Sequence, residues 1–334
     1  MPRLAQLPAS QTNTMMRLPC AIALFLPTML LAQDPGMSAP GASDPYMAPT
    51  TPLPTTGTQA ANSYMRGAFG LSLTNAYYFR GIVQENQGII AQPHVELGYD
   101  LIEPGSTEGL NRLDLRLGSW NSLHSDHPEA ANDGIWYESD FYIDLTAGIG
   151  ERLTTGVRYT AYTSPNATFN QVRDSGLRDN VQELAFTFGY DDRGLLFDSL
   201  DSGLQPHFLI AFELDGQRDN GNAGNEGMYA EVGVRPSFRL QQDEPNGLTL
   251  SLPVRAGFSF GDYYERIGGG RDDFFGYLDV GAELGLPLTF LPTRMGPWQA
   301  STGLHWLLLG DNLEARNNGD TSELIFSVGV STRW

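Results

Sequence analysis

The side chains of this sequence that could carry chemistry are charged residues that recur at every second position of short segments. In residues 275–288, Asp279 and Glu283 alternate with Val280 and Leu284. A β-strand points successive side chains to opposite faces, so such a segment would present one charged face and one apolar face. Charges that surround a water-filled path select ions, whereas charges that pair with one another can fill a closed interior.

The charged phase has the same character in most of these segments. We predict that it lines an interior, and the residues expected there are Arg80, Glu96, Asp114, Arg116, Asp140, Asp144, Arg158, Glu213, Glu231, Arg235, Arg255, Asp279 and Glu283. Asp100, Glu183, Arg239 and Arg333 share this phase, which gives ten acids against seven Arg. Such a lining would favour cations mildly. The alternative is a network of ion pairs that plugs the interior.

Three other patterns could indicate a site. Residues 257–261, GFSFG, match the Gly-x-Ser-x-Gly pattern of serine hydrolases, but Ser259 lies in an alternating segment and not at a strand-to-helix turn. HSDH at 124–127 lacks a nearby ligand of zinc spacing, and residues 215–226 resemble a calcium loop with Asn220 where glycine is needed. We therefore expect no cofactor, no metal and no enzymatic reaction. A barrel lipid hydrolase with a Ser/His pair near a membrane interface is the enzymatic alternative.

The composition narrows the range of partners. The 334 residues include 39 Asp and Glu against 20 basic residues, all of them Arg, and the net charge is −19. Binding to nucleic acid requires a basic surface, so we expect no nucleic-acid partner. The acidic excess is compatible with attraction of cations and with an ordinary solvated surface.

The first 64 residues have the composition of a targeting segment and a linker. Arg17 precedes an apolar run that ends near Ala32, which predicts a secretory signal peptide over residues 1–33. Cys20 is the only cysteine, so the mature chain would contain no disulfide. Residues 34–64 are rich in Pro, Thr and Ala and are expected to form a disordered linker.

Residues 65–334 repeat one period-two pattern. Twelve segments follow it, at 66–80, 88–101, 110–121, 135–149, 152–163, 180–191, 204–215, 226–240, 247–261, 273–290, 297–309 and 321–334. Mostly long polar connections follow the odd-numbered segments, and mostly shorter ones follow the even-numbered segments, as in an up-and-down barrel. The sequence therefore predicts an all-β fold, a closed antiparallel transmembrane β-barrel of about 12 strands.

A secreted β-sandwich would also have one apolar face, so further observations must decide which way that face points. Most segments run 12 residues or more, longer than the ~5–6 residues typical of soluble strands. Each Arg of the charged phase would cost roughly 2–4 kcal/mol on a lipid-facing surface at mid-membrane. The apolar phase is therefore expected to face lipid and the charged phase to face inward.

Aromatic residues of the apolar phase gather near segment ends, as in the girdles at the two membrane interfaces. They are Tyr77, Phe79, Tyr99, Tyr137, Tyr159, Tyr190, Trp298, Trp306 and Trp334. Phe326 shares the phase of Trp334 in the last segment. A terminal aromatic in this phase resembles the signal by which bacterial outer-membrane barrels are recognised for insertion. We therefore expect outer-membrane lipid and the barrel-assembly machinery as partners.

Several blocks also resemble one bacterial family. YYFRGIVQ at 77–84 is similar to an aromatic-x-Phe-Arg-Gly-Ile-x-Gln pattern of the TorF-family porins, and Gly118, Trp120 and Ser122 match a Gly-x-Trp-x-Ser block loosely. The similarity is clearest over residues 70–190. It implies an outer-membrane barrel and a pore, with no reaction and no established substrate. The Pro/Thr linker is not a feature of that family.

The functional expectation combines these inferences. We predict a porin-like channel of the bacterial outer membrane that passes small solutes and prefers cations mildly. An even number of strands would bring both ends of the barrel to the periplasmic side. The alternative from another class is a structural barrel with a plugged interior that anchors other components.

Overall fold

The computed structural model describes residues 65–102, 109–126, 135–165, 180–195, 202–215, 226–240, 247–266, 271–292 and 296–334. The predicted signal peptide over 1–33 and the predicted linker over 34–64 lie outside the described residues. So do His127 and most of the candidate calcium loop over 215–226.

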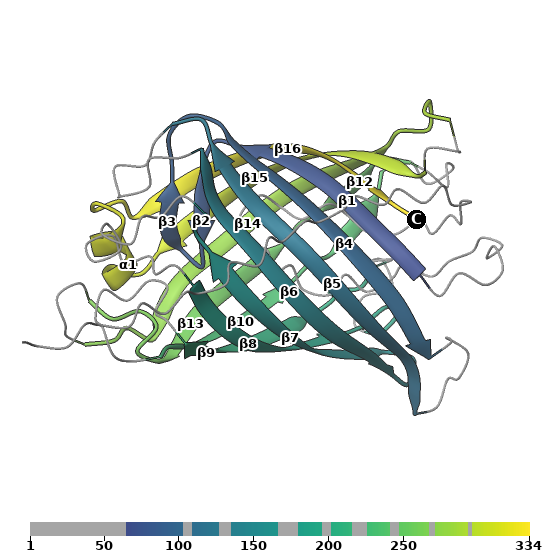
Figure 1. Cartoon of the computed structure of the whole chain (residues 1–334), viewed down its shortest axis with the longest axis horizontal. Helices are drawn as coiled ribbons and strands as arrows, with labels where there is room; N and C mark the ends of the chain where they lie inside the picture. Colours follow the sequence, from purple (N-terminus) through teal and green to yellow (C-terminus); the bar gives the residue numbers. More distant parts are fainter. Residues whose placement is uncertain are drawn as a thin grey trace, which may run out of the picture. The chain divides into compact units, whose positions relative to one another are not determined.

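The described residues form a closed antiparallel barrel of twelve wall strands (Figure 1). In chain order the wall consists of β1 (Met65–Thr74), β4 (Ile90–Ile102), β5 (Leu110–His124), β6 (Trp136–Ile149), β7 (Leu153–Thr163), β8 (Asn180–Tyr190), β9 (His207–Asp215), β10 (Met228–Val234) with β11 (Ser237–Arg239), β12 (Thr249–Ser251) with β13 (Val254–Gly261), β14 (Phe275–Pro287), β15 (Trp298–Leu309) and β16 (Ser322–Arg333). The predicted fold class and strand number are confirmed.

Each wall strand pairs with its neighbours in sequence, and the barrel closes where β1 pairs with β16. The register there joins Ala68 to Arg333 and Thr74 to Ser327. β1 begins and β16 ends at one rim, here called the terminal rim, and the opposite end is the hairpin rim. Closure pairs every wall strand on both sides and so leaves no free sheet edge.

Two of the predicted segments are each divided by a proline. Pro236 separates β10 from β11, and Pro253 separates β12 from β13. Proline has no backbone N–H to give to a ladder, so pairing is interrupted at these positions. The carbonyl oxygens of both prolines still accept backbone hydrogen bonds, from Leu252 and Gly281 respectively. The wall therefore remains continuous across the interruptions.

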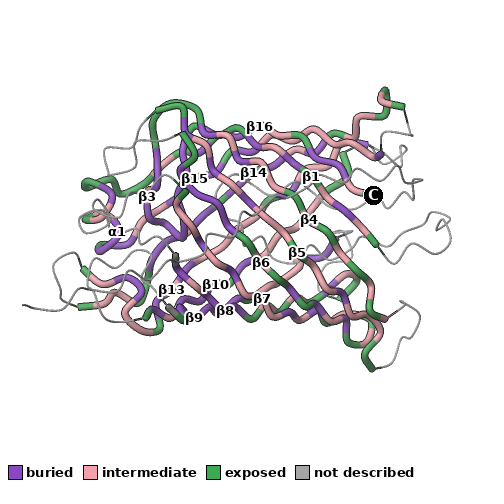
Figure 2. The backbone as a smooth tube through the Cα atoms, viewed as in Figure 1, coloured by how far each residue is buried: buried purple, intermediate pink, exposed green. Residues whose placement is uncertain are grey.

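The apolar phase of the wall strands faces outward. Along β4 the exposed side chains of Val95, Leu97 and Tyr99 alternate with less exposed inward residues, and the same alternation continues around the wall (Figure 2). Leu97 and Phe326 are each 51% exposed. A soluble sandwich would bury these side chains between two sheets, so the outer face of this barrel is the lipid-facing surface of a transmembrane barrel. No helix in the described part of the chain has the length and apolar composition needed to cross a membrane.

The first predicted segment, 66–80, is wrong beyond Thr74. The chain leaves the wall there and forms a separate two-stranded hairpin from β2 (Tyr77–Phe79) and β3 (Ile82–Glu85). Tyr77 and Phe79 are fully buried inside the barrel, so they do not belong to the predicted lipid-facing girdle. Figure 1 shows the hairpin at the rim opposite the C-terminus.

The hairpin reverses at Arg80 and Gly81, whose φ angles are 51° and 83°. Positive φ at both central residues defines a type I′ turn, the two-residue turn whose twist matches that of paired strands. Glycine adopts this conformation without strain, whereas the Cβ of Arg80 opposes it. Gly81 therefore permits the turn, and Arg80 adopts a positive φ that its side chain disfavours.

A second difference from the expected loops is the short helix α1 (Asp311–Arg316), between β15 and β16. Its buried Leu313 joins the apolar cluster inside the hairpin half of the barrel, together with Ile82, Leu307 and Ile325. The core of this protein therefore lies inside the barrel at the hairpin rim.

Candidate functional site in the barrel interior

The interior holds all thirteen charged residues predicted to line it. Twelve are inward residues of the wall strands or of the β10–β11 connection: Glu96, Asp114, Arg116, Asp140, Asp144, Arg158, Glu213, Glu231, Arg235, Arg255, Asp279 and Glu283. The thirteenth, Arg80, lies at the tip of the hairpin and not on a wall strand. The structure brings eleven of these residues together in two wall networks and one latch. Glu213 instead accepts from the Gly227 N–H at 2.7 Å, and Asp140 is fully buried.

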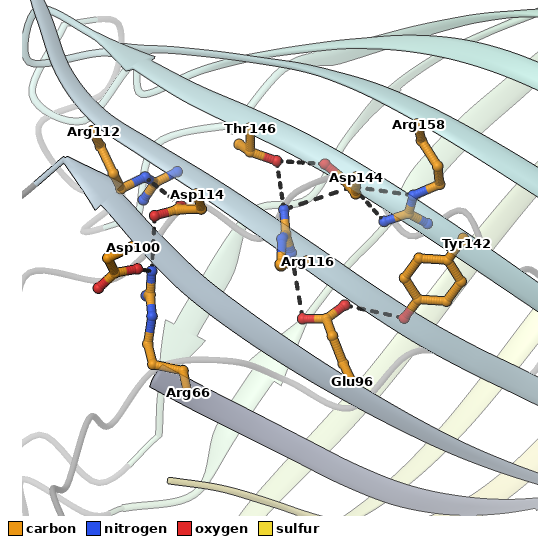
Figure 3. A network of polar contacts seen from close by, with 10 residues as sticks. All are labelled: Arg66, Glu96, Asp100, Arg112, Asp114, Arg116, Tyr142, Asp144, Thr146 and Arg158. Atoms are coloured by element: carbon orange, nitrogen blue, oxygen red, sulfur yellow. Dashed lines mark hydrogen bonds and ion pairs between the residues drawn. The ribbon is translucent and has the colours of Figure 1, made fainter. Parts of the chain in front are cut away.

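The first wall network begins near the terminal rim and crosses β1, β4 and β5 (Figure 3). Arg66 pairs with Asp100 and, at 2.8 Å, with Asp114. Asp114 also forms an ion pair with Arg112, whose Nε lies 3.0 Å from a carboxylate oxygen. Asp114 thus joins two guanidinium groups, one from β1 and one from β5.

The same network continues across β5, β6 and β7. Arg116 lies 3.7 Å from Glu96 and 3.8 Å from Asp144, and it donates to the Thr146 hydroxyl at 2.7 Å. Arg158 donates to Asp144 through Nε at 3.0 Å and through Nη2 at 2.7 Å. Figure 3 shows how these carboxylates and guanidinium groups alternate along the wall.

The second wall network lies on β10, the β10–β11 connection, β13, β14 and β15, and Glu231 of β10 joins it 3.8 Å from Arg255. Arg235 pairs with Glu283, and Arg255 donates to Asp279 at 2.9 Å. His305 contacts both carboxylates, with Nδ1 3.0 Å from Asp279 and Nε2 3.3 Å from Glu283. β5 and β13 are six strands apart in either direction round the ring, so the two networks occupy opposite walls.

The latch is the contact of Arg80 with the wall at the hairpin rim. Its guanidinium donates to both oxygens of Glu183 on β8, at 2.6 and 2.9 Å, and to the Tyr263 hydroxyl at 3.1 Å. It also lies over the ring of Tyr229 on β10, 4.1 Å from the centroid. Burial alone would lower the pKa of Arg80, but the carboxylate of Glu183 outweighs it and holds that pKa above its ordinary value. Arg80 is therefore a buried, charged side chain whose two terminal nitrogens both donate hydrogen bonds.

The backbone of the hairpin is also attached to the surrounding elements. Tyr264 donates through its hydroxyl to the Arg80 carbonyl at 3.0 Å. Asn317, which follows α1, donates to the Gly81 carbonyl at 2.7 Å and accepts from the Val83 N–H at 2.9 Å. Tyr77 donates to Glu138 on β6 at 3.0 Å. These contacts come from side chains, whereas wall strands are held by continuous backbone ladders.

The two halves of the interior differ in their access to solvent. In the first wall network the side chains of Arg116 and Glu96 are 17% and 19% exposed. At the latch the side chains of Arg80 and Glu183 are 0% and 2% exposed. Solvent therefore reaches the wall charges nearer the terminal rim, and the hairpin seals the other half.

A serine and a histidine do lie side by side, as the enzymatic alternative requires. The Ser122 hydroxyl is 2.8 Å from His124 Nε2, and Glu85 of the hairpin lies 4.0 Å from His124 Nδ1. Ser122 and His124 are fully buried under the hairpin, and His124 stacks on Tyr137. Neither side chain is exposed to solvent in this conformation.

Ser259 of the GFSFG motif has a different role. Its side chain is buried, donates to Asp272 at 2.6 Å and accepts from the Tyr263 N–H at 3.1 Å. Asp272 accepts from the Tyr264 N–H as well, at 2.9 Å. Burial raises the pKa of Asp272 above its ordinary value. Ser259 therefore holds the segment that carries Tyr263 and Tyr264.

The predicted girdle divides into outward and inward residues. Trp306, Trp334 and Phe326 are exposed on the outer face, and Trp298 packs edge-on against Phe69 with centroids 6.5 Å apart. Tyr99 and Tyr190 are exposed as well. Tyr137 is a correction: a register shift between β5 and β6 turns it inward, where it donates to Gln84 at 2.9 Å.

Sequence reasoning missed several residues of the interior. Arg66 and Arg112 belong to the first network, and Tyr229 and Tyr277 both donate to one oxygen of Glu231, at 2.8 and 2.7 Å. The signal for the tyrosines was present, because both share the phase of the charged residues. Tyr263 lies outside the wall strands, so no alternation could have indicated it.

The fold and the lining define this chain as a transmembrane β-barrel protein with a hairpin folded into its interior. No family model and no curated protein match the sequence. Among solved structures, an outer-membrane channel from Pseudomonas putida F1 is similar, with 11% identity, a TM-score of 0.43 and coverage of 84% of this chain and 100% of the other. The transport unit of the autotransporter AIDA-I from Escherichia coli has 10% identity, a TM-score of 0.38 and coverage of 84% and 93%. LpxR from Salmonella typhimurium has 8% identity, a TM-score of 0.35 and coverage of 79% and 99%.

Proposed function

We propose that this protein is a channel of the bacterial outer membrane for small solutes, seen here in a closed conformation. The observation that carries the proposal is the division of the interior. Wall charges toward the terminal rim, such as Arg116 and Glu96, are partly exposed to solvent, while the β2–β3 hairpin closes the other half without belonging to the wall. A barrel that served only as a scaffold would not need a closing element separate from its wall.

The orientation follows from the strand number. Twelve wall strands return the chain to its starting side, and Gly67 and Trp334 meet at the terminal rim. We assign this rim to the periplasm and the hairpin rim to the exterior. Outer-membrane lipid then contacts the exposed apolar face, and the barrel-assembly machinery would engage β16 and its terminal Trp334. Membership of the TorF-family porins stays a prediction.

The lining supports passive passage and a mild preference for cations. In the first network Arg66, Arg112, Arg116 and Arg158 are matched by four carboxylates, so that wall is neutral overall. The second network sets three carboxylates against two Arg and His305. At the latch Arg80 pairs with Glu183, and the buried Glu138 and Glu213 add two more carboxylates to the interior. Rings of charge of this kind set ion selectivity without any chemical step.

The structural barrel remains the rival proposal, because the same hairpin could be a permanent part of the core. A shortened variant distinguishes the two. Thr74 and Ile90 are the last register pair of β1 and β4, so an Asn-Gly turn could join them in place of residues 75–89. The wild-type protein and this variant would be compared in planar lipid bilayers.

We expect brief or rare current steps from the wild-type protein and frequent, cation-preferring steps from the shortened variant. A matched control shortens the β9–β10 connection at the same rim, over residues 217–224, and leaves the hairpin and its described contacts in place. Absence of current from both the wild-type protein and the folded shortened variant would contradict the channel and favour the structural barrel.

A further inference from the structure

The groups that hold the Arg80 guanidinium form a cage that belongs largely to the barrel and not to the hairpin. Glu183 comes from β8, Tyr229 from β10, and Tyr263 from the segment after β13. Glu183 supplies two oxygens in the fork geometry that matches a guanidinium, and Tyr229 supplies an aromatic face. This combination of bidentate carboxylate and stacked ring is specific for a planar, delocalised cation.

The cage is held in place by contacts that do not involve Arg80. The Tyr229 hydroxyl donates to Glu231 at 2.8 Å, and Tyr277 donates to the same oxygen at 2.7 Å. Ser259 and Asp272 hold the backbone of the Tyr263–Tyr264 segment. The Tyr162 hydroxyl donates to Oε1 of Glu183 at 3.3 Å. If the hairpin left the interior, Glu183, Tyr229 and Tyr263 would therefore keep their positions relative to one another.

The turn that carries Arg80 gives an independent indication. The first central position of a type I′ turn favours Asn, Asp or Gly, because φ is positive there. This chain has Arg at that position with φ of 51°. Arg gains nothing from the turn itself, so its presence is explained by the side chain that it delivers to the cage.

We propose that this cage is a binding site for guanidinium compounds and similar planar organic cations, and that Arg80 is its tethered occupant. The inference rests on the proposed function, because a soluble ligand would reach the cage through the channel. A ligand that takes the place of the Arg80 guanidinium on Glu183 and Tyr229 would release the hairpin tip. Solutes of this class would then favour their own passage by opening the closed half of the interior.

The test uses methylguanidinium as the probe, with methylammonium as a charged control and methylurea as a planar neutral control. R80A empties the cage and keeps a Cβ at the positive-φ position, so the backbone of the turn is unchanged. We expect methylguanidinium to raise the Tm of detergent-solubilised R80A by several degrees, with saturation, because a ligand that binds only the folded state stabilises it. Neither control compound should do so, and R80A/E183Q should lose the response.

A second measurement uses the wild-type protein and needs no variant. Methylguanidinium competes with Arg80 there, so it should speed hydrogen exchange of the backbone amides of residues 77–85, while methylurea should not. Equal responses to all three compounds, or no response in either measurement, would overturn the site. If R80A does not fold, the shortened variant that lacks residues 75–89 takes its place, because it also exposes the cage.

These readouts separate the site from the channel. Saturable binding to R80A with no current from any variant would contradict the channel and leave the site intact. Conversely, current through R80A that methylguanidinium neither blocks nor alters, together with an unchanged Tm, would contradict the site and leave the channel intact.

Discussion

Gly67 and Trp334 exchange two backbone hydrogen bonds at the seam that closes the barrel, with N···O distances of 2.8 and 3.0 Å. The indole of Trp334 lies over Gly67 on the lipid-facing side, where a Cβ on Gly67 would collide with the ring. The last residue of the chain is therefore packed on the first wall strand. This contact gives the terminal aromatic a role in closure as well as in the predicted recognition by assembly machinery.

The seam contact predicts the effect of two substitutions. W334A removes the ring from Gly67, and G67L displaces the ring, so both should lower the fraction of chains that form a closed, heat-modifiable barrel on a gel. W306A is the matched control, because Trp306 is also exposed on the outer face but lies away from the β1–β16 seam. Equal losses from W334A and W306A would indicate a general effect of aromatic residues in lipid and not of the seam.

The latch predicts strong coupling between Arg80 and Glu183. R80M or E183M alone leaves one buried charge without its partner, which should cost about 3–5 kcal/mol of unfolding free energy. The double variant removes both charges and should lose clearly less than the sum of the single losses. Urea unfolding in lipid vesicles, followed by tryptophan fluorescence, measures all four proteins. Strictly additive losses would contradict the latch.

In the first wall network, we expect buried ion pairs to contribute more to the free energy of unfolding than exposed ones. Asp144 accepts two hydrogen bonds from Arg158 and its side chain is 8% exposed, so D144N should cost about 3 kcal/mol. Asp100 pairs with Arg66, whose side chain is 41% exposed, so D100N should cost about 0–1 kcal/mol. The same unfolding assay compares them. A larger loss from D100N than from D144N would contradict the described geometry of this wall.

Glu85 of the hairpin predicts a pH dependence. Burial raises its pKa and outweighs the hydrogen bonds from the Asn86 and Gln87 N–H groups, which lower it. A raised carboxyl pKa means that the folded state binds this proton more tightly than the unfolded state does. The stabilisation is therefore complete below the unfolded pKa, and it is lost as the pH rises through the folded pKa.

E85Q removes this dependence and keeps an oxygen that can accept from the same N–H groups. We expect E85Q to raise the Tm at about pH 8 and to change it little at about pH 4, where the wild-type carboxyl is protonated. Thermal unfolding of both proteins at the two pH values checks this. A Tm difference of the same size at both pH values would show that Glu85 does not titrate across the transition.

The strand pattern could be predicted from the sequence because it is local. Side chains alternate along any β-strand, so the phase of Leu324 and Phe326 against Ser327 already fixes which residues share a face. The cost of placing Arg116 or Arg158 in lipid then fixes which face points inward. These two arguments led to the twelve strands, the outward belt and the inward charges.

The exceptions arise where distant residues compete with local alternation. Tyr77 and Phe79 fit the apolar phase, but they turn inward because Arg80 binds Glu183, which is 103 residues away in the sequence. Tyr137 also fits the apolar phase, and a one-residue register shift against β5 moves it to the inner face. Alternation carries no information about such contacts.

The sequence by itself determined the class of fold, the number of wall strands and the side of the wall on which each charge lies. Only the tertiary structure decided that a hairpin folds into the interior, which carboxylate each Arg meets, and that Glu183, Tyr229 and Tyr263 form one cage. The reason is physical. The first set depends on strand geometry and on the cost of a charge in lipid, and both act on each segment separately. The second set depends on which side chains the closed ring brings within contact distance.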